Sequence, residues 1–286
     1  MSTPPQAPIG LMSAMHEELA LLLDAMPDEQ KLTVAGRDFW QGHWQGRPVV
    51  AVLSRIGKVA AATTATALIE RFGAQRIVFT GVAGGIGEGV RVGDVVLASS
   101  FVQHDMDASP LFARHEVPLY GRSRFGTDTA LSNGLAQAAQ QVLAQVTAHV
   151  GAPAVAEFGL HAPRLHTGLI ASGDRFVSTT AECRALQQAL PEALAVEMEG
   201  AAVAQVCADY GVAFAALRTI SDRADDDAQS AERAEDDRQV VPGIGSLQPE
   251  EVVPERRRRG RGEAEQEAVE GQVMVEAARI ARLLVV

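Results

Sequence analysis

The stretch Leu-Ala-Val-Glu-Met-Glu-Gly at residues 194–200 leads from an apolar strand into an apolar helix. It places two carboxylates, Glu197 and Glu199, at the junction. Such a junction lies at the carboxyl edge of a sheet, where open α/β folds bind their ligands. An uncompensated charge with little solvent around it costs several kcal/mol, so a polar ligand group is expected beside these carboxylates. A ribose diol fits that requirement.

Strand and helix patterns alternate on both sides of this junction. Apolar and β-branched runs predict strands, and alanine- or leucine-rich runs at helical spacing predict helices. Strands are expected at 9–14, 39–44, 48–54, 76–80, 94–102, 164–171, 194–196 and 213–221, and helices at 16–26, 58–72, 128–146, 180–190 and 199–210. The alternation predicts an α/β fold, a three-layer αβα sandwich with a central mixed, largely parallel sheet.

The alternation ends at about Asp225, so residues 1–225 are expected to form one domain. Residues 226–272 hold acidic clusters, three prolines and the arginine run 256–259, with few large apolar residues. Such a segment buries too little apolar surface to offset its ordering entropy, so we expect it to be disordered. Residues 273–286 recover an amphipathic pattern and are expected to form a C-terminal helix.

Composition narrows the class of protein. The 286 residues carry a net charge of −11, which argues against a nucleic-acid partner held by phosphate contacts. The two cysteines, Cys183 and Cys207, lack metal-site or CxxC spacing, as in a reduced compartment. Neither a membrane-length apolar run nor a signal-peptide pattern is present in this sequence. We therefore expect a cytoplasmic protein with no nucleic-acid or membrane partner.

Other strand ends also carry carboxylates. The acids at positions 17 and 18 follow the first strand and, alone, are explained by the dipole of the next helix. Asp222 ends the last strand and, alone, is explained as a helix cap. Together with the pair at 197 and 199, however, three strand ends carry acids. That convergence predicts one shared site.

Three further stretches leave alternatives open. The glycine-rich segment 80–87 indicates either a close approach of backbone to a ligand or a tight turn, and it does not match a dinucleotide-binding motif. Phe176 either stacks on a base or belongs to the core. The cluster at 104–107 has no second histidine at ligand spacing, so no metal is expected.

Read together, these segments resemble the 5′-methylthioadenosine/S-adenosylhomocysteine nucleosidase family of the nucleoside phosphorylase-like superfamily. The combination of VEMEG, a downstream SD and an N-terminal AMxEE is specific. The matching stretches run in order from residue 9 to residue 225: IGLMSAMHEEL, SRIGKVAAATTATALIERF, VFTGVAGGIGEGVRVGDVV, QHDMD, GLIASGDRFVS, AVEMEGAAVAQVC and RTISDRAD. The resemblance implies a nucleoside phosphorylase-like fold and, without a cofactor, hydrolysis of adenine thionucleosides to adenine and a thioribose in methionine salvage.

The resemblance also implies roles for individual residues. Glu18 is expected to activate water, and Asp222 to protonate N7 of adenine. Substrate contacts are expected from Glu197, Met198, Glu199, Phe176, Val177, Ala83, Gly84, Ile56, Ser221 and Arg218. Within this set, Glu199 holds the ribose hydroxyls with Met198 against the sugar, and Phe176 and the backbone of Val177 bind adenine.

Arg218 and Ser221 are expected to support the acid at 222, and Ala83 and Gly84 to line the floor of the pocket. Where the family carries glycine, this chain has Arg55, which is expected to add a charge near the pocket rim.

The family resemblance further implies a homodimer, in which Leu111, Phe112 and Pro118 are candidates to reach the neighbour's pocket. Two alternative functions stay open. One is a phosphorylase of the same fold, although such enzymes need arginines for the phosphate. The other is an impaired nucleoside-binding member, because segment 226–272 replaces the helix that covers the acid in the family. The 5′ substituent is not fixed among methylthioadenosine, S-adenosylhomocysteine, 5′-deoxyadenosine and aminofutalosine.

Overall fold

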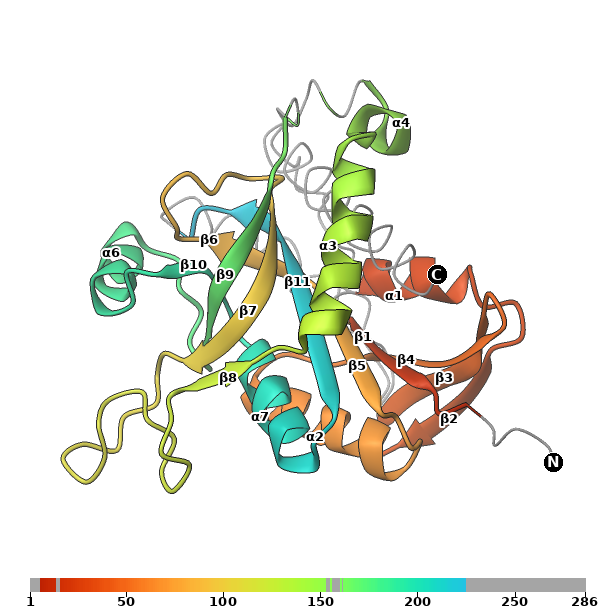
Figure 1. The fold of residues 1–286 in the computed structure, drawn as a ribbon, viewed down its shortest axis with the longest axis horizontal. Helices are drawn as coiled ribbons and strands as arrows, with labels where there is room; N and C mark the ends of the chain where they lie inside the picture. The colour runs from red at the N-terminus through yellow and green to blue at the C-terminus, as the bar shows by residue number, and fades with distance from the viewer. Residues whose placement is uncertain (1–5, 14–15, 153–154, 156–159, 161, 225–286) are drawn as a thin grey trace, which may run out of the picture.

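A mixed sheet of eleven strands runs through the described part of the chain, which is residues 6–13, 16–152, 155, 160 and 162–224 of a computed structural model (Figure 1). Its strand order is β2-β3-β4-β1-β5-β11-β6-β10-β9-β7-β8. The strands are β1 Ile9–Ser13, β2 Gln30–Val34, β3 Arg37–Trp44, β4 Arg47–Leu53, β5 Arg76–Thr80, β6 Val82–Gly85, β7 Val95–Gln103, β8 Arg124–Gly126, β9 Leu165–Ser172, β10 Ala193–Glu197 and β11 Ala213–Asp222. The helices are α1 His16–Leu23, α2 Lys58–Glu70, α3 Thr129–Leu143, α4 Val146–Val150, α6 Thr180–Ala189 and α7 Gly200–Tyr210.

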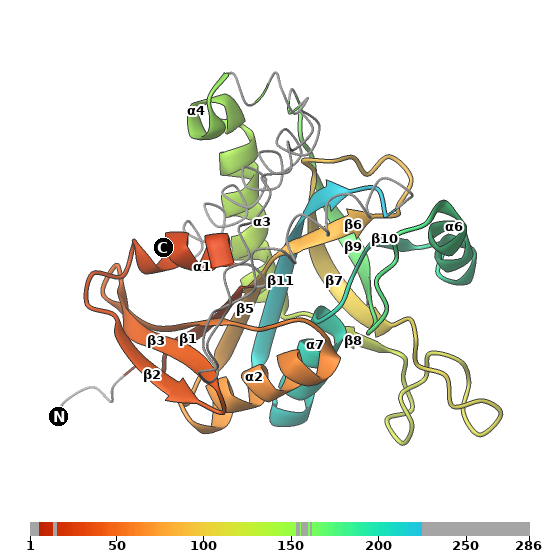
Figure 2. The same cartoon turned by 180° about the vertical axis from the view of Figure 1, so that it is seen from behind.

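Helices cover both faces of the sheet around β1, β5 and β11. Helices α2 and α7 pack side by side on one face, and α1 and α3 lie on the other (Figures 1 and 2). Alternate strand residues separate two apolar clusters: Met12 and Phe79 face α2 and α7, whereas Leu11 and Val78 face α1 and α3. This half of the molecule is three-layered, as the sequence predicted.

The other half of the sheet closes on itself, which corrects the expectation of a simple sandwich. Strand β11 is ten residues long, and its first half pairs in parallel with β5. Its second half pairs in parallel with β6 and antiparallel with β7. Because β6, β10, β9 and β7 are themselves paired in succession, β6, β10, β9, β7 and β11 form a closed five-stranded barrel.

Local sequence signals explain several boundaries. Gln45 and Gly46 both have positive φ and make the tight turn between β3 and β4. Asp128 caps α3 by accepting from the backbone N–H of Leu131 at 2.8 Å. The helix expected at 128–146 ends earlier, and α4 follows as a separate short helix. The expected disordered segment 226–272 and the helix at 273–286 lie outside the described residues.

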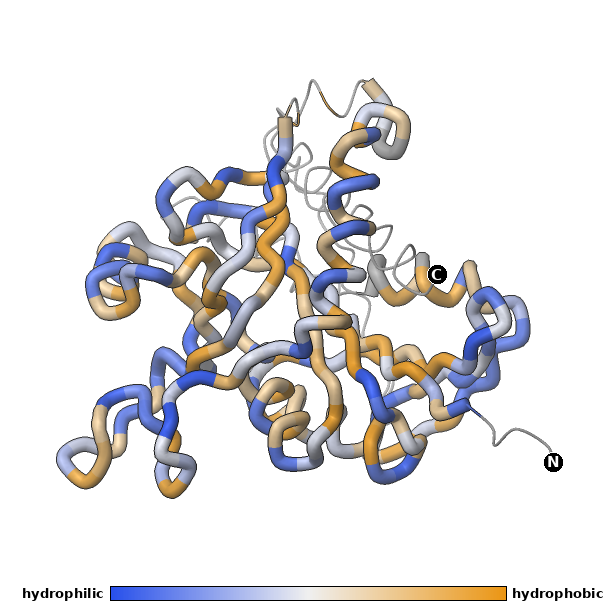
Figure 3. The backbone as a smooth tube through the Cα atoms, in the orientation of Figure 1, coloured by the Kyte–Doolittle hydropathy of each residue, from blue (hydrophilic) through white to orange (hydrophobic). Residues whose placement is uncertain are grey.

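The segment between β7 and β8 projects from the body of the molecule (Figure 1). Its tips are hydrophobic (Figure 3), and Leu111 and Leu119 are 84% and 92% exposed. Within the described residues, no helix has the length and apolarity that crossing a membrane requires.

Candidate active site

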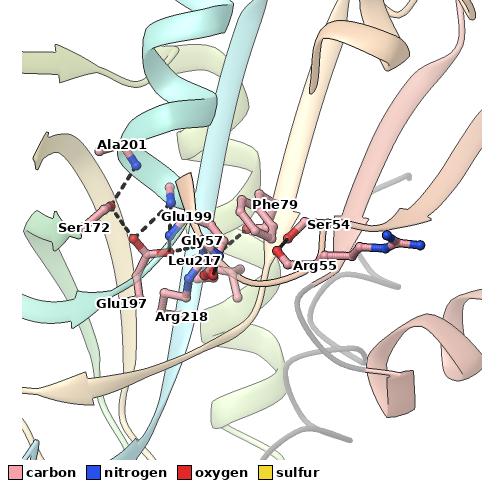
Figure 4. A network of polar contacts seen from close by, with 11 residues as sticks. Ser54, Arg55, Gly57, Phe79, Ser172, Glu197, Glu199, Ala201, Leu217 and Arg218 are labelled. Carbon is pink, nitrogen blue, oxygen red and sulfur yellow. Dashed lines mark hydrogen bonds and ion pairs between the residues drawn. The ribbon is translucent and has the colours of Figure 1, made fainter. Parts of the chain in front are cut away.

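Glu197 lies in a buried ion pair. Its Oε2 is 2.8 Å from Nη2 of Arg218, a side chain with no exposed surface (Figure 4). The backbone N–H of Gly200 donates to the same carboxylate at 2.9–3.0 Å, and the Ser172 hydroxyl also donates to it. These donors compensate the charge of a carboxylate withdrawn from water.

Arg218 was expected to support the acid at position 222, and the structure corrects that expectation. Besides Glu197, its guanidinium donates to the carbonyl oxygen of Phe79 at 3.2 Å and lies 4.1 Å from the centre of that ring. Because the arginine is wholly buried against Glu197, it has no surface that a ligand could contact.

Glu199 occupies a different environment, although it is only two residues further along. It is the residue before α7, it is buried, and its Oε1 accepts from the backbone N–H of Gly57 at 2.8 Å (Figure 4). Burial, followed by the negative charge of Glu197, raises the pKa of Glu199 to about 7. In the described part of the chain no ion pair involves Glu199. Its carboxyl group is therefore a buried, weakly compensated acceptor.

Glycine at position 200 is what lets α7 begin here. A Cβ on Gly200 would lie 2.2 Å from the ring of Phe101, inside contact distance. The last residue of the VEMEG motif is thus fixed by the close packing of α7 against β7.

Asp222 ends β11 beside β6. Its Oδ2 accepts from the Ser221 hydroxyl at 2.8 Å, and its Oδ1 accepts from the backbone N–H of Ala224 at 2.6 Å. Asp222 is in register with Gly84, where a Cβ would be 3.0 Å from Oδ1. The structure therefore places Ala83, Gly84 and Ser221 with Asp222, and the glycine-rich segment supplies a strand whose backbone approaches an acid.

The segment between β9 and α6 lies next to this acid. Val177 is buried in one apolar cluster with Val196 of β10 and Ala224, which follows Asp222 closely. Phe176 and Met198 are half-buried. The expected base-binding residues therefore share one end of the barrel with Asp222 and the two glutamates.

Other expected residues lie at the margin. Ile56 is 62% exposed in the loop that leads into α2. Arg55 was expected to charge the pocket rim, but its guanidinium donates to the carbonyl oxygen of Gly36 in the turn between β2 and β3 and points away from Glu199 (Figure 4).

Glu18 belongs to α1, but its side chain lies outside the described part of the structure. Helix α1 begins just after β1. The carbonyl oxygen of Ser13, the last residue of β1, accepts from the backbone N–H of Ser54, which follows β4, at 2.9 Å.

Sequence reasoning missed the role of Ser172 and Gly57. Ser172 donates to Glu197 and accepts from the backbone N–H of Ala201 at 2.8 Å, so it joins β9 to the start of α7. The position of Ser172 at the end of a predicted strand was the available signal. For Gly57, whose contribution is a backbone N–H, the side chains carry no signal.

Comparisons with known proteins agree on a family. The model of the phosphorylase superfamily matches residues 8–243. A 5′-methylthioadenosine/S-adenosylhomocysteine nucleosidase of Marinomonas sp. (strain MWYL1) is 37% identical over 215 residues, which is 75% of this chain and 85% of that protein. One from Shewanella frigidimarina (strain NCIMB 400) is 35% identical over 224 residues, 77% of this chain and 88% of that protein.

The chain belongs to the 5′-methylthioadenosine/S-adenosylhomocysteine nucleosidase family.

Solved structures support the same placement. The nucleosidase of Neisseria meningitidis in complex with methylthio-immucillin-A superposes with a TM-score of 0.75 at 26% identity, covering 98% of this chain and 99% of that one. The futalosine hydrolase of Helicobacter pylori strain 26695 gives 0.73 at 27% identity, covering 97% and 96%. The resemblance inferred from the nucleosidase motifs is thus confirmed, and so is the phosphorylase-like α/β fold.

Proposed function

We propose that this protein hydrolyses the N-glycosidic bond of 5′-methylthioadenosine and S-adenosylhomocysteine to adenine and the corresponding thioribose. The observation that carries the proposal is the contrast between two buried glutamates. Arg218 neutralises Glu197, whereas Glu199 keeps a weakly compensated carboxyl group with a pKa of about 7. Such an acceptor suits the two hydroxyls of a ribose, because each donates a hydrogen bond that offsets the burial of the carboxylate. The names of the relatives support the same substrates.

The sugar is held from the α7 side of the site. Glu199 accepts from the ribose hydroxyls while Gly57 fixes one of its oxygens. Met198 packs against the sugar, and Ile56, exposed in the neighbouring loop, faces the 5′ substituent. Glu197 contributes by orienting the turn that carries Glu199, since it accepts from the Glu199 backbone N–H at 3.2 Å.

The base is held from the barrel side. Phe176 stacks on adenine, and the backbone of Val177 binds its edge. Ala83 and Gly84 form the floor, where even a Cβ at position 84 would lie 2.7 Å from Ala224 and 3.0 Å from Asp222 Oδ1. Ser221 and Ala224 both donate to Asp222, which fixes the direction of its carboxyl group toward the base.

The reaction exchanges one bond at C1′. The C1′–N9 bond breaks with its electron pair passing to the purine, and Asp222 gives a proton to N7. Water bonds to C1′ and loses a proton to Glu18. The transition state resembles the oxocarbenium ion of glycoside hydrolysis. A positioned acid of this kind contributes about 10²–10⁴-fold to the rate.

Adenine release from 5′-methylthioadenosine by the purified protein tests the proposal. Glu18→Gln and Asp222→Asn are expected to abolish release, while the exposed acids Glu29→Gln and Asp24→Asn serve as matched controls and keep it. Unchanged rates in the first pair would overturn the assigned roles. Binding of the nucleoside without turnover by the wild-type protein would favour an impaired, nucleoside-binding member.

Neither Arg218 nor Arg55 supports a phosphorylase of the same fold. Arg218 is buried against Glu197, and the guanidinium of Arg55 is bound at the turn between β2 and β3. We expect adenine release to be independent of added phosphate. Release of ribose 1-phosphate derivatives would identify a transferase instead. A panel that includes S-adenosylhomocysteine, 5′-deoxyadenosine and aminofutalosine would rank the substrates.

We further propose that the protein is a cytoplasmic homodimer that acts in methionine salvage. The exposed apolar residues Leu111 and Leu119 on the projecting β7–β8 segment, and Val59 on α2, support a homodimer, in which Phe112 and Pro118 belong to the segment that reaches the neighbour. Sedimentation of the wild type and of Leu119→Asp tests it. A monomeric wild-type protein with full activity would contradict the homodimer.

A further inference from the structure

We propose that Lys58 and Asp174 form a latch that positions the base-binding segment 173–177 against the start of α2. The residues that contact adenine and those that contact ribose then keep a fixed position relative to one another. This inference rests on the proposed function, because it assigns Lys58 and Asp174 as positioning residues for the same nucleoside. Neither residue contacts the nucleoside in this proposal.

Lys58 is the first residue of α2, and its ammonium group is largely enclosed, with 16% of the side chain exposed. Nζ donates to Asp105 Oδ1 at 2.6 Å and to Gln103 Oε1 at 3.1 Å, and it lies 3.8 Å from Asp174 Oδ2. One cation therefore joins the end of β7, the loop after it and the loop after β9. A lysine that contributed only to solubility would extend into solvent and would not contact three separate segments.

Asp174 makes the second half of the latch. Its Oδ1 accepts from the backbone N–H of Lys58 at 2.7 Å, and its own N–H donates to Asp105 Oδ2 at 2.9 Å. Burial opposes ionisation of Asp105, but the hydrogen bonds from Lys58 and Asp174 outweigh it and hold the pKa of Asp105 below its usual value. Through side chains and backbone N–H groups, the three residues thus form a closed set of charge-assisted contacts.

The latch connects directly to the ribose side of the site. Gly57 and Lys58 present consecutive backbone N–H groups, the first to Glu199 at 2.8 Å and the second to Asp174 at 2.7 Å. Gly57 has φ of +94°, and a Cβ there would lie 3.2 Å from Asp174 Oδ1. The two N–H groups lie on adjacent peptide units joined at the Cα of Gly57, so the φ and ψ of Gly57 set the direction of one relative to the other.

The latch also connects to the base side. Asp174 is two residues before Phe176, on the loop that ends at α6. Its neighbour Gly173 is wedged against the ring of His104, because a Cβ on Gly173 would lie 2.3 Å from Nε2. The position of this loop along the barrel edge is thus set by Asp174 on one side and by the His104 contact on the other. Loss of the contacts made by Asp174 is expected to leave Phe176 without a fixed position.

The test compares two lysine–aspartate pairs. Lys58→Met removes the latch cation, and Lys31→Met removes a similar pair, Lys31 with Asp38 at 3.2 Å, on the exposed β2–β3 hairpin. For 5′-methylthioadenosine, Lys58→Met is expected to raise KM about tenfold with kcat nearly unchanged, because the contacts are made equally in the ground and transition states. Lys31→Met leaves both parameters unchanged. Asp174→Asn, which keeps the acceptor and loses the charge, is expected to lie between.

Adenine alone probes the base side separately. Calorimetric titration with adenine is expected to show weaker binding in Lys58→Met and recovery in Lys58→Arg, which restores the cation. A merely structural role would lower the melting temperature of Lys58→Met without changing KM or adenine affinity at 25 °C, and that result would overturn the latch. So would equal KM values in Lys58→Met and Lys31→Met.

The outcome also separates this inference from the proposed function. Wild-type protein that neither releases adenine from methylthioadenosine nor binds it would overturn the function and the latch with it. Normal wild-type turnover with an unaltered Lys58→Met variant would overturn the latch alone.

Discussion

The backbone N–H of Gly57 donates to the carboxylate of Glu199 at 2.8 Å across 142 positions of sequence. This contact and the nearby charge of Arg218 favour the ionised carboxylate, but burial and the charge of Glu197 outweigh them and raise the pKa of Glu199 to about 7. The hydrogen bond alone therefore leaves Glu199 near half-protonation at neutral pH. Nucleoside hydroxyls would add the missing donors.

Stability should depend on pH through this group. The pKa of Glu199 rises from 4.5 to about 7 on folding, so the folded protein keeps a proton that the unfolded chain has lost. The contribution is fully present below pH 4.5 and is lost as pH rises through 7, at about 1.4 kcal/mol per pH unit within that window. Urea unfolding of wild type and Glu199→Gln between pH 5 and 8 measures it. The variant is expected to lack this part of the slope, and identical slopes would refute the assignment.

Substrate binding should show the opposite trend. The ribose hydroxyls donate to the ionised form of Glu199, so KM for 5′-methylthioadenosine is expected to rise as pH falls below about 7. Glu199→Gln should bind weakly at every pH, since an amide oxygen is a poorer acceptor than a carboxylate. Initial rates measured over the same pH range with both proteins check this. A pH-independent KM in the wild type would contradict it.

Removing one partner of the buried ion pair is expected to lower the free energy of unfolding more than removing both charges. Arg218→Met leaves the Glu197 carboxylate buried without its cation, and we expect a destabilisation of about 3–5 kcal/mol. The double variant Arg218→Met with Glu197→Gln should recover much of this, because no charge is then left unpaired. Thermal and denaturant unfolding of the single and double variants measure the difference. A double variant no more stable than Arg218→Met would show that the charge is not the cause.

The sequence predicted most strands and helices because their apolar periodicity is local. It did not predict β6, interpreted as a glycine-rich turn or a ligand-approach loop. Glycines have low strand propensity, and their use here is set by distant neighbours: a Cβ on Gly84 would lie 2.7 Å from Ala224, and one on Gly85 would lie 2.9 Å from Ile220. Closure of the barrel was equally hidden, because the β11–β7 pairing joins residues such as Leu217 and Leu97 that no local pattern relates.

The candidate site was likewise predicted where the signal is local and missed where it depends on distant contacts. Motifs located Glu199 and Asp222 at the ends of two strands, and in the structure Glu199 follows β10 and Asp222 ends β11, with β6 between the two strands. The partner of Arg218 was misassigned because motif order says nothing about which buried acid a guanidinium reaches through the sheet. Lys58 escaped notice for a related reason. Its partners, Asp105 and Asp174, come from two loops that only the packed barrel brings together.

Two glycines in helices offer a matched test of packing at the VEMEG motif. A Cβ on Gly200 would lie 2.2 Å from the ring of Phe101, so Gly200→Ala should force α7 away from β7 and destabilise the protein by about 1–3 kcal/mol. Gly134 of α3 has no neighbour within 4 Å of its Cβ position, so Gly134→Ala should stabilise by about 0.5–1 kcal/mol through helix propensity. Because α7 carries Glu199 at its start, Gly200→Ala should also raise KM, whereas Gly134→Ala should not. Unfolding curves and adenine-release kinetics of both variants check these opposite signs. Equal stability changes in the two variants would mean that the start of α7 is not packed against Phe101.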